Sequence, residues 1–299
     1  MLHRTLIPQG KGGYTISLPV AWVRERRLKP GDPVTLELTD QGIHVSADAP
    51  ALPLVVRLSF EQEAEPFIRF ALSNAYRNGF THVEAHFRTG RQERTIEQVT
   101  RDLLPGFEIT ERHQGHLVLS LVAEPSVKEE GILSRMLYMM RDSLRELESA
   151  MQSGQRKKIS HIRGLHLDLD RSSNMLRRHL FLNRLQSRQG FYYWAICHEL
   201  SVVQHSVSRA YAHLSPPSSR ARRIFADVKE RVLAIQDAFL RKNMVALEKA
   251  HDTANRFRYD QLFPAIRKGE DSLIILAAIE ILRSSYLMIS PMLGILLIP

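Results

Sequence analysis

Basic side chains gather at two places in the C-terminal half of this 299-residue chain. Because ammonium and guanidinium groups attract anions, such clusters predict contact with nucleic-acid phosphates or with an acidic protein. The first cluster follows one predicted helix, and its proposed anion contacts are Arg156, Lys157, Lys158, Arg177 and Arg178. The second opens a later helix with Arg220, Arg222 and Arg223. A solvated helix face is the alternative interpretation of both clusters.

The sequence carries no recognisable catalytic motif. The glycine-rich stretch at 9–13 lacks the G-K-[ST] end of a phosphate-binding P-loop, and no nucleophile–base pair is evident. Four histidines, namely His82, His86, His113 and His116, are dispersed over predicted strands. The single cysteine, Cys197, excludes a disulfide framework and lies in an apolar stretch typical of a core. We therefore expect no enzyme and no catalytic residue.

The composition is that of a globular protein with an anionic partner. Hydrophobic residues make up 44% and charged residues 24%, and the net charge is +9. The charge is uneven: it is +1 for residues 1–50, −2 for 51–124 and +10 for 125–299. We expect a cytoplasmic protein without a membrane span, because no apolar run reaches about 18 residues. The closest, 284–299, predicts a buried last helix.

The first fifty residues predict a small β-rich domain. Alternating apolar residues indicate strands at 2–7, 14–18, 34–38 and 43–45. A short basic helix starts with Pro19 at its first position and ends near Arg27. So small a unit buries little apolar surface alone, and pairing with a second copy is the simplest remedy.

The motif G-K-G-G-Y-T-I-S-L-P-x-x-W-V, followed by L-K-P-G-D-x-V-x-L, resembles the AbrB/SpoVT swapped-hairpin DNA-binding domain. The resemblance covers residues 2–46. It implies that two chains interleave their hairpins into a dimeric β-barrel that binds DNA through basic side chains. By position in the motif, these side chains are Arg4, Lys11, Arg24, Arg26 and Arg27, with His3 as a further candidate. Lysine and arginine suit this role because they neutralise phosphates.

Residues 51–124 predict a small α/β module of unknown role. Strands are expected at 54–58, 81–87, 107–110 and 116–122, in the order βαβαββ. The helices are expected to open with capping boxes at Ser59-x-x-Gln62 and Thr95-x-x-Gln98, and the first to end at Asn78-Gly79. The fragments A-Y-R-N-G-F and P-G-F-E-I resemble the middle segment of archaeal phosphate uptake regulators.

Residues 125–299 are helical in pattern throughout. Six amphipathic helices are expected at 127–152, 156–188, 191–214, 219–241, 244–267 and 270–297. A Ser/Pro-rich loop at 214–219 divides them three and three, which predicts two antiparallel three-helix bundles.

This duplication resembles the PhoU fold, and the stretch H-I-R-G-L-H-L-D-L-D-R resembles a PhoU motif. In PhoU proteins, paired E-x-x-x-D motifs hold multinuclear metal clusters. Here His166 replaces the first glutamate, four residues before Asp170, and the next helix keeps Glu199. The other motif positions hold Val203, His251, Asn255, Leu282 and Tyr286. We therefore expect no metal cofactor, with a single site at His166, Asp170 and Glu199 as the alternative.

The expected fold class is multidomain α+β, with domains at 1–50, 51–124 and 125–299. This order resembles archaeal phosphate uptake regulators end to end. The resemblance implies a homodimeric DNA-binding transcription regulator linked to phosphate uptake or phosphate homeostasis. The alternative is a PhoU-type signalling adaptor that binds a phosphate transporter, a kinase or another acidic protein, with the N-terminal domain as a dimerisation module.

Overall fold

A computed structural model of the chain describes residues 3–10, 12–39, 42–47, 54–62, 64–153, 159–183, 188–214, 216–266 and 272–298. The chain divides into two compact units, Met1–Leu54 and Val55–Pro299. We call the first unit the head. The second unit joins the α/β module and the helical domain, which the sequence treats as separate domains.

The head consists of two hairpins and one short helix. Strands β1 (Ile7–Gln9) and β2 (Gly13–Thr15) pair antiparallel, and so do β3 (Thr35–Thr39) and β4 (Gly42–Ser46). Between the hairpins, α1 spans Val20–Glu25, with Pro19 as the residue before the helix rather than its first residue. The two sheets remain separate, so the described part of a single head forms no closed barrel.

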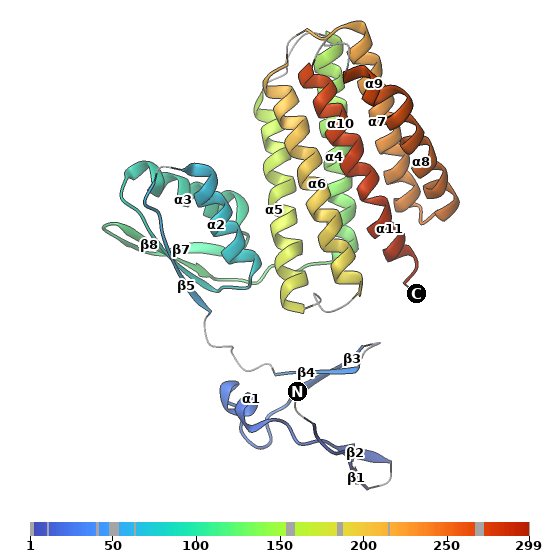
Figure 1. The fold of residues 1–299 in the computed structure, drawn as a ribbon. Coiled ribbons are helices and arrows are strands. Elements are labelled where there is room, and N and C mark those ends of the chain that lie inside the picture. Colours follow the sequence, from blue (N-terminus) through green and yellow to red (C-terminus); the bar gives the residue numbers. More distant parts are fainter. Residues whose placement is uncertain are drawn as a thin grey trace. The chain divides into compact units, whose positions relative to one another are not determined.

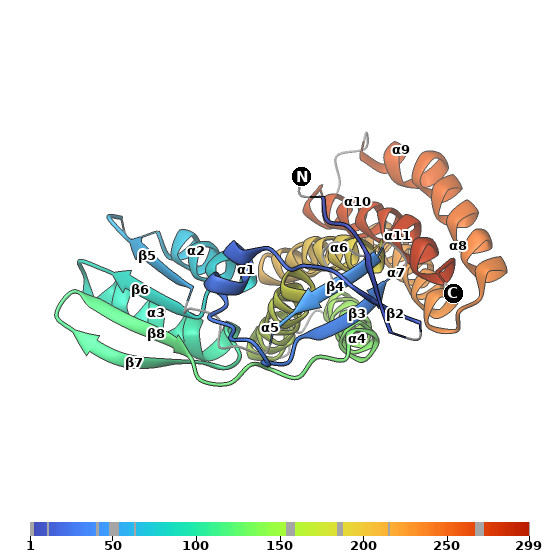
Figure 2. The same cartoon turned by 90° about the horizontal axis from the view of Figure 1, so that it is seen from below.

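The α/β module has the expected βαβαββ order. Its elements are β5 (Val55–Ser59), α2 (Glu65–Arg77), β6 (His82–His86), α3 (Gly90–Leu103), β7 (Phe107–His113) and β8 (His116–Leu121). The sheet order is β5-β6-β8-β7, with β5 and β6 parallel and the other pairs antiparallel. Both helices cover the same face of this sheet (Figure 1; Figure 2).

The helix starts of this module differ from the sequence prediction. A capping box does open α3, but it uses Thr89 and Gln92, and the predicted Thr95 lies inside the helix. Helix α2 begins after Ala64 without a side-chain cap, so the predicted box at Ser59 is also wrong. The predicted end of α2 is confirmed, because Asn78 caps it and Gly79 follows with a positive φ of 81°.

The helical domain contains the six expected helical segments, two of them interrupted. They are α4 (Glu129–Ser153), α5 (Ile159–Asn183), α6 (Arg188–Ala212), α7 (Ser219–Leu240), α8 (Met244–Phe257) and α10 (Ser272–Leu287). A π-helical turn, η1 (Arg258–Leu262), leads from α8 into α9 (Phe263–Ile266). Helix α11 (Ile289–Leu296) continues α10 after a break at Met288.

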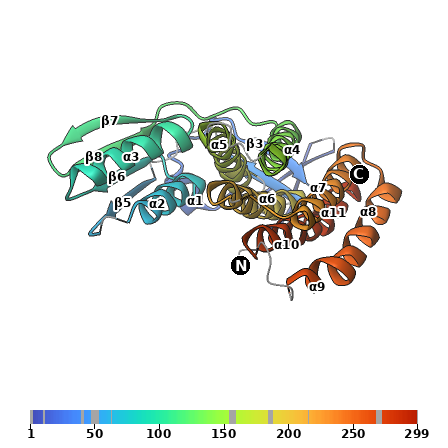
Figure 3. The same cartoon turned by 90° about the horizontal axis from the view of Figure 1, so that it is seen from above.

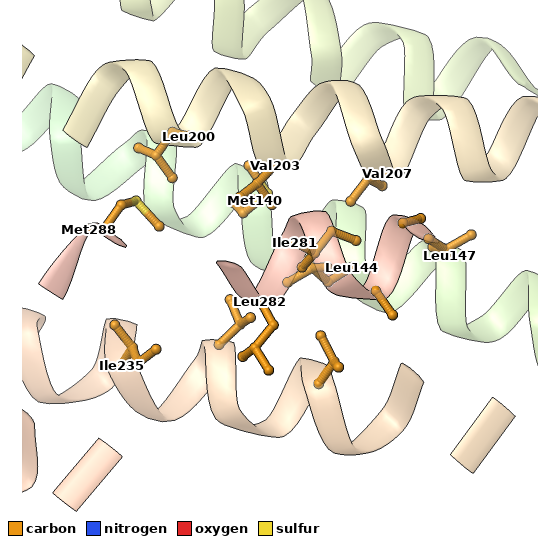
Figure 4. Packing of buried hydrophobic residues seen from close by; sticks show 14 of the residues in the cluster. Met140, Leu144, Leu147, Leu200, Val203, Val207, Ile235, Ile281, Leu282 and Met288 are labelled. Carbon is orange, nitrogen blue, oxygen red and sulfur yellow. The ribbon is translucent and has the colours of Figure 1, made fainter. Parts of the chain in front are cut away.

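One apolar core runs through all of these helices. Helices α4, α5 and α6 pack on one another, and α8 packs on the outer side of α7 (Figure 3). Helix α10 packs on both α6 and α7, so the two predicted three-helix groups share a single interior. Figure 4 shows residues such as Leu144, Val203 and Leu282 meeting there from three different helices.

The last helical segment is the most apolar part of the chain. Within the described residues, Leu273–Leu296 is the one stretch long and apolar enough to cross a membrane by length and composition. However, 56% of its apolar window is buried inside the domain, as is typical of a core helix in a soluble protein. The expected buried last helix is therefore present, and it lies within the predicted range of 270–297.

Candidate functional site

Helix α5 joins the α/β module to the helical domain through a row of polar side chains. Asp170, Asn174 and Arg178 follow one another at intervals of four residues, which places them on one face of the helix. That face meets α2 and α3 of the module. We call these three residues the α5 seam.

Arg178 is almost fully buried, with 1% of its surface exposed. Its Nη1 donates to the backbone carbonyls of Tyr76 at 2.7 Å and Phe80 at 3.0 Å. Its Nε and Nη2 donate to the two carboxylate oxygens of Glu124, at 2.9 and 3.0 Å. The guanidinium also lies 5.0 Å from the ring centre of Tyr76. Arg178 therefore connects α5 to the end of α2 and to the segment that follows β8.

Asn174 holds the middle of the seam. Its Oδ1 accepts from Arg77 Nε at 2.7 Å, and its Nδ2 donates to the Leu103 carbonyl at 2.9 Å. Both α2 and α3 are thereby fixed to the same side chain of α5. The hydrogen bonds of Asn174 and Arg178 together join the module to the helical domain.

At the other end of the seam, Asp170 lies in a cluster with two histidines. Its Oδ2 is 3.2 Å from His166 Nε2 and accepts from Arg69 Nη2 at 2.6 Å. His166 Nδ1 is 2.8 Å from Ser208 Oγ on α6. The His205 ring, also on α6, meets the His166 ring edge to face at 4.7 Å between centres.

The electrostatics of this cluster favour an ionised Asp170 and a neutral His205. Burial opposes ionisation of Asp170, but the hydrogen bond from His166 and the charges of His166 and Arg69 together lower its pKa. Burial also lowers the pKa of His205, and the neighbouring His166 adds to this effect. Neutral imidazole and ionised carboxylate are the forms that bind metals.

His166, Asp170 and His205 could hold one transition-metal ion. One ligand atom from each lies within 4.8 Å of the others. Two imidazole nitrogens and one carboxylate oxygen suit zinc or iron(II). The group offers a single carboxylate, so it does not fit the multinuclear cluster that paired acidic motifs would hold. Arg69 occupies the same oxygen of Asp170 and would have to yield it to a metal.

The structure replaces one predicted ligand. His166 and Asp170 come together as expected, but their third neighbour is His205, and Glu199 is not in the group. The signal in the sequence was helix register. His166 lies 17 residues before the end of α5 at Asn183, and His205 lies 17 residues after the start of α6 at Arg188. The sequence prediction ended one helix at 188 and began the next at 191, and with those bounds the two distances are no longer equal.

The second repeat has a related pair. His251 on α8 and Tyr286 on α10 are hydrogen-bonded, with 2.7 Å between Nε2 and Oη. The sequence prediction placed both at motif positions, and the structure brings them together. Leu282, at another motif position, belongs to the apolar core. The described part of this repeat therefore provides no ligand set like that of His166, Asp170 and His205.

The predicted anion contacts on α5 prove to be buried where the structure describes them. Arg177 and Arg178 expose 6% and 1% of their surface, so they are not part of an exposed basic face. The protein tolerates the burial of Arg178 because its guanidinium donates to two backbone carbonyls and to a carboxylate. Arg156, Lys157 and Lys158 lie outside the described residues. Arg222 and Arg223 at the start of α7 are exposed.

Arg177 packs into the interior against α6. Its guanidinium lies 5.4 Å from the ring centre of Trp194 and contacts the Cys197 thiol. The prediction of Cys197 as a core residue is confirmed, because its surface is fully buried. Burial raises the pKa of this thiol to about 11. Burial and the charge of Arg177 lower the pKa of Arg77 to about 10.

Three of the four module histidines form a stack on the sheet face opposite the helices. The ring centres of His86 and His116 are 5.0 Å apart, and those of His113 and His116 are 4.4 Å apart. The rings are nearly parallel, at 24° and 16°. Parallel rings point their nitrogen lone pairs in separate planes, so the stack does not form a common metal site.

The head exposes both its basic and its apolar side chains. Arg4, Arg24 and Arg27 are exposed and Arg26 is half-buried, whereas Lys11 lies outside the described residues. No described residue of the head is buried. Nine of its large apolar side chains are exposed by 37–81%, namely Leu6, Ile7, Tyr14, Ile16, Val20, Val34, Leu36, Leu38 and Ile43. An apolar surface of this kind marks an interaction site.

Comparison with family models, with curated proteins and with solved structures found no match to this chain.

Proposed function

We propose that the chain is a dimeric DNA-binding transcription regulator in which two heads form one DNA-binding domain. The observation that carries this proposal is the exposure of the apolar side chains on both hairpins of the head. Leu38, for example, is 81% exposed and Tyr14 71%. A second head supplies the missing core most simply, because in a two-fold symmetric dimer the same apolar surface of each copy packs against the other. The resemblance of residues 2–46 to the swapped-hairpin domain supports this arrangement.

The exposed arginines of the head support the choice of DNA as partner. Arg24 and Arg27 flank the end of α1, and Arg27 has a positive φ of 53°, which turns the chain sharply after the helix. Arg4 precedes the first strand and is exposed. In a dimer each of these side chains occurs twice, which suits a two-fold symmetric DNA site. Arginine can bind phosphates and can also donate two hydrogen bonds to guanine.

Electrophoretic mobility shift tests the proposal with the full chain and the DNA upstream of its own gene. We expect a shift at low salt that weakens steeply as salt is added. The double variant Arg24→Ala/Arg27→Ala should bind at least tenfold more weakly. Its salt dependence should also become shallower by about one per lost phosphate contact.

The matched control removes the same charge from the helical domain. Arg135→Ala/Arg145→Ala changes two exposed arginines of α4 and should leave the shift intact. A folded dimer that gives no shift at low salt contradicts DNA binding. That result would favour the adaptor, in which the head serves only to join two chains. A monomer at micromolar concentration contradicts the dimeric head itself.

The link to phosphate homeostasis rests on the resemblance of the whole architecture to archaeal phosphate uptake regulators. We propose the helical domain as the part that responds to a signal, because it carries most of the buried polar residues of the unit. Genome-wide mapping of bound DNA in phosphate-rich and phosphate-poor cells tests this link. Identical binding maps in both conditions would contradict it.

A further inference from the structure

The guanidinium of Arg177 is a buried charge with unused donors. Only 6% of the residue is exposed, and neither Nε nor Nη2 has a hydrogen-bond partner in the described part of the chain. These two nitrogens form one edge of the planar group, which is the edge that takes two oxygens of a carboxylate or phosphate side by side. Buried charges in proteins are normally paired, because an unpaired one is strongly destabilising.

Two other arginines of the same unit show what normally fills this edge. Arg178 directs Nε and Nη2 to both oxygens of Glu124. Arg141 directs the same two nitrogens to Gln236 and Asp237. The contacts of Arg177 are different in kind: an indole face and a thiol. Neither contact carries a negative charge at neutral pH, so the Arg177 edge remains available for an anion.

A second guanidinium, that of Arg77 at the end of α2, is bonded to the residue that lies one helical turn before Arg177. Arg77 Nε donates to Asn174, three residues before Arg177 on α5, and the charge of Arg177 contributes to the lowered pKa of Arg77. Asn174 accepts from Arg77 Nε, which fixes the side chain and leaves its two terminal nitrogens for another acceptor. Two guanidinium groups held together in this way attract an anion more strongly than either does alone.

The acidic side chains near this pair are committed elsewhere. Asp170 is the carboxylate whose charge raises the pKa of Arg77, but it is already bonded to Arg69 and to His166. Glu124 pairs with Arg178. The junction of α2, α5 and α6 therefore holds more buried positive charge than its described carboxylates neutralise.

We propose that Arg177 and Arg77 bind a small tetrahedral oxyanion, of the phosphate or sulfate class, at the junction of α2, α5 and α6. The Nε–Nη2 edge of Arg177 binds two oxygens from inside the domain. The terminal nitrogens of Arg77 bind a third oxygen from the half-buried side, through which the anion enters. The anion supplies the negative charge that this junction lacks and bridges the α/β module to the helical domain.

This inference goes beyond the proposed function and does not depend on DNA binding. The test uses the full chain without DNA, so its failure and that of the mobility shift are separate results. Thermal unfolding is followed in sodium phosphate, sodium sulfate, sodium acetate and sodium chloride at matched ionic strength. Equilibrium dialysis with radiolabelled phosphate measures binding directly. We expect a saturable rise in Tm with phosphate and sulfate, and one bound phosphate per chain.

Variants of Arg177 separate an anion site from a structural arginine. Arg177→Met should abolish phosphate binding, and its Tm without oxyanion should equal or exceed that of the natural chain, because an unpaired buried charge is removed. Arg177→Lys keeps the charge but loses the two-nitrogen edge, so binding should weaken at least tenfold. Arg163→Met, at an exposed position of the same helix, should change neither binding nor Tm.

Three results would overturn the proposal. Equal stabilisation of the protein by chloride or acetate and by phosphate would indicate charge screening or carboxylate binding. Phosphate binding that persists in Arg177→Met would place the anion elsewhere. If Arg177→Met does not fold, Arg77→Met takes its place, and unchanged phosphate binding in that variant counts against the site equally.

Discussion

Replacing Arg178 by methionine should cost the Val55–Pro299 unit about 3–5 kcal/mol of unfolding free energy, the usual loss when one partner of a buried charged network is removed. The substitution keeps most of the buried aliphatic chain and removes the guanidinium. The carbonyls of Tyr76 and Phe80 then lose their donor inside the protein. Each hydrogen bond from a charged group contributes about 1.5–3 kcal/mol, which accounts for most of the loss.

The ion pair contributes less than the two carbonyl bonds. The Glu124 side chain is 49% exposed, so water screens it, and we discount its pairing with Arg178 to at most about 1 kcal/mol. The variant Glu124→Gln should therefore lose no more than this amount. A larger loss in Glu124→Gln than in Arg178→Met would show that the ion pair contributes more than the two carbonyl bonds.

Urea unfolding followed by circular dichroism gives the free energies, and hydrogen exchange locates the effect. Exchange in Arg178→Met should accelerate first at the end of α2 and the start of β6, next to the two carbonyls. Arg163→Met, exposed on the same helix, should stay within about 0.5 kcal/mol of the natural chain. Equal stability of Arg178→Met and Arg163→Met would refute the role of Arg178 as the connection between module and helical domain.

Two further predictions concern the same helices. Titration with zinc should detect one site per chain by calorimetry, and His205→Ala should remove it. Glu199→Gln, which changes the third ligand of the alternative site considered from the sequence, should leave it intact. Retention of the site in His205→Ala would exclude the ligand set described above. Cys197 should resist thiol reagents in the folded protein, because burial raises its pKa to about 11. At pH 8 its thiolate fraction is roughly a thousandth, against about a quarter for an ordinary thiol. The reactivity of the Cys197 thiol should rise as the pH approaches its pKa in the folded protein. At pH 8 the thiol should react only after denaturation. Fast labelling of the native chain at pH 8 would contradict the burial of Cys197.

The helices could be predicted because their signals are local. Leu169, Leu176 and Leu180 recur at helical spacing on α5, and all three are buried as the pattern indicates. The shared core could not be predicted in the same way. It depends on α10 packing against α6, and no spacing within either helix specifies its neighbour.

The candidate site was predicted only in part, again for a physical reason. The spacing of His166 and Asp170 places both on one face of a helix, so their contact follows from the sequence. His205 joins them through the register of two antiparallel helices, and a small error in the position of the turn changes the partner. Arginine is usually exposed, so the sequence favoured a surface role for Arg178, but its burial depends on two carbonyls about a hundred residues away.

The α5 seam has a consequence for how this protein can vary. Each residue advances an α-helix by about 100°, so one inserted residue between Asp170 and Arg178 would turn Arg178 away from α2 while Asp170 kept its place. The positions of the histidine cluster and of the Arg178 contacts to the module therefore depend on the same stretch of α5. Substitutions along α5 are tolerable one at a time, but its length between these two residues is not free to change. Chains with this architecture should accept insertions in the loops around α5 and preserve the spacing within it.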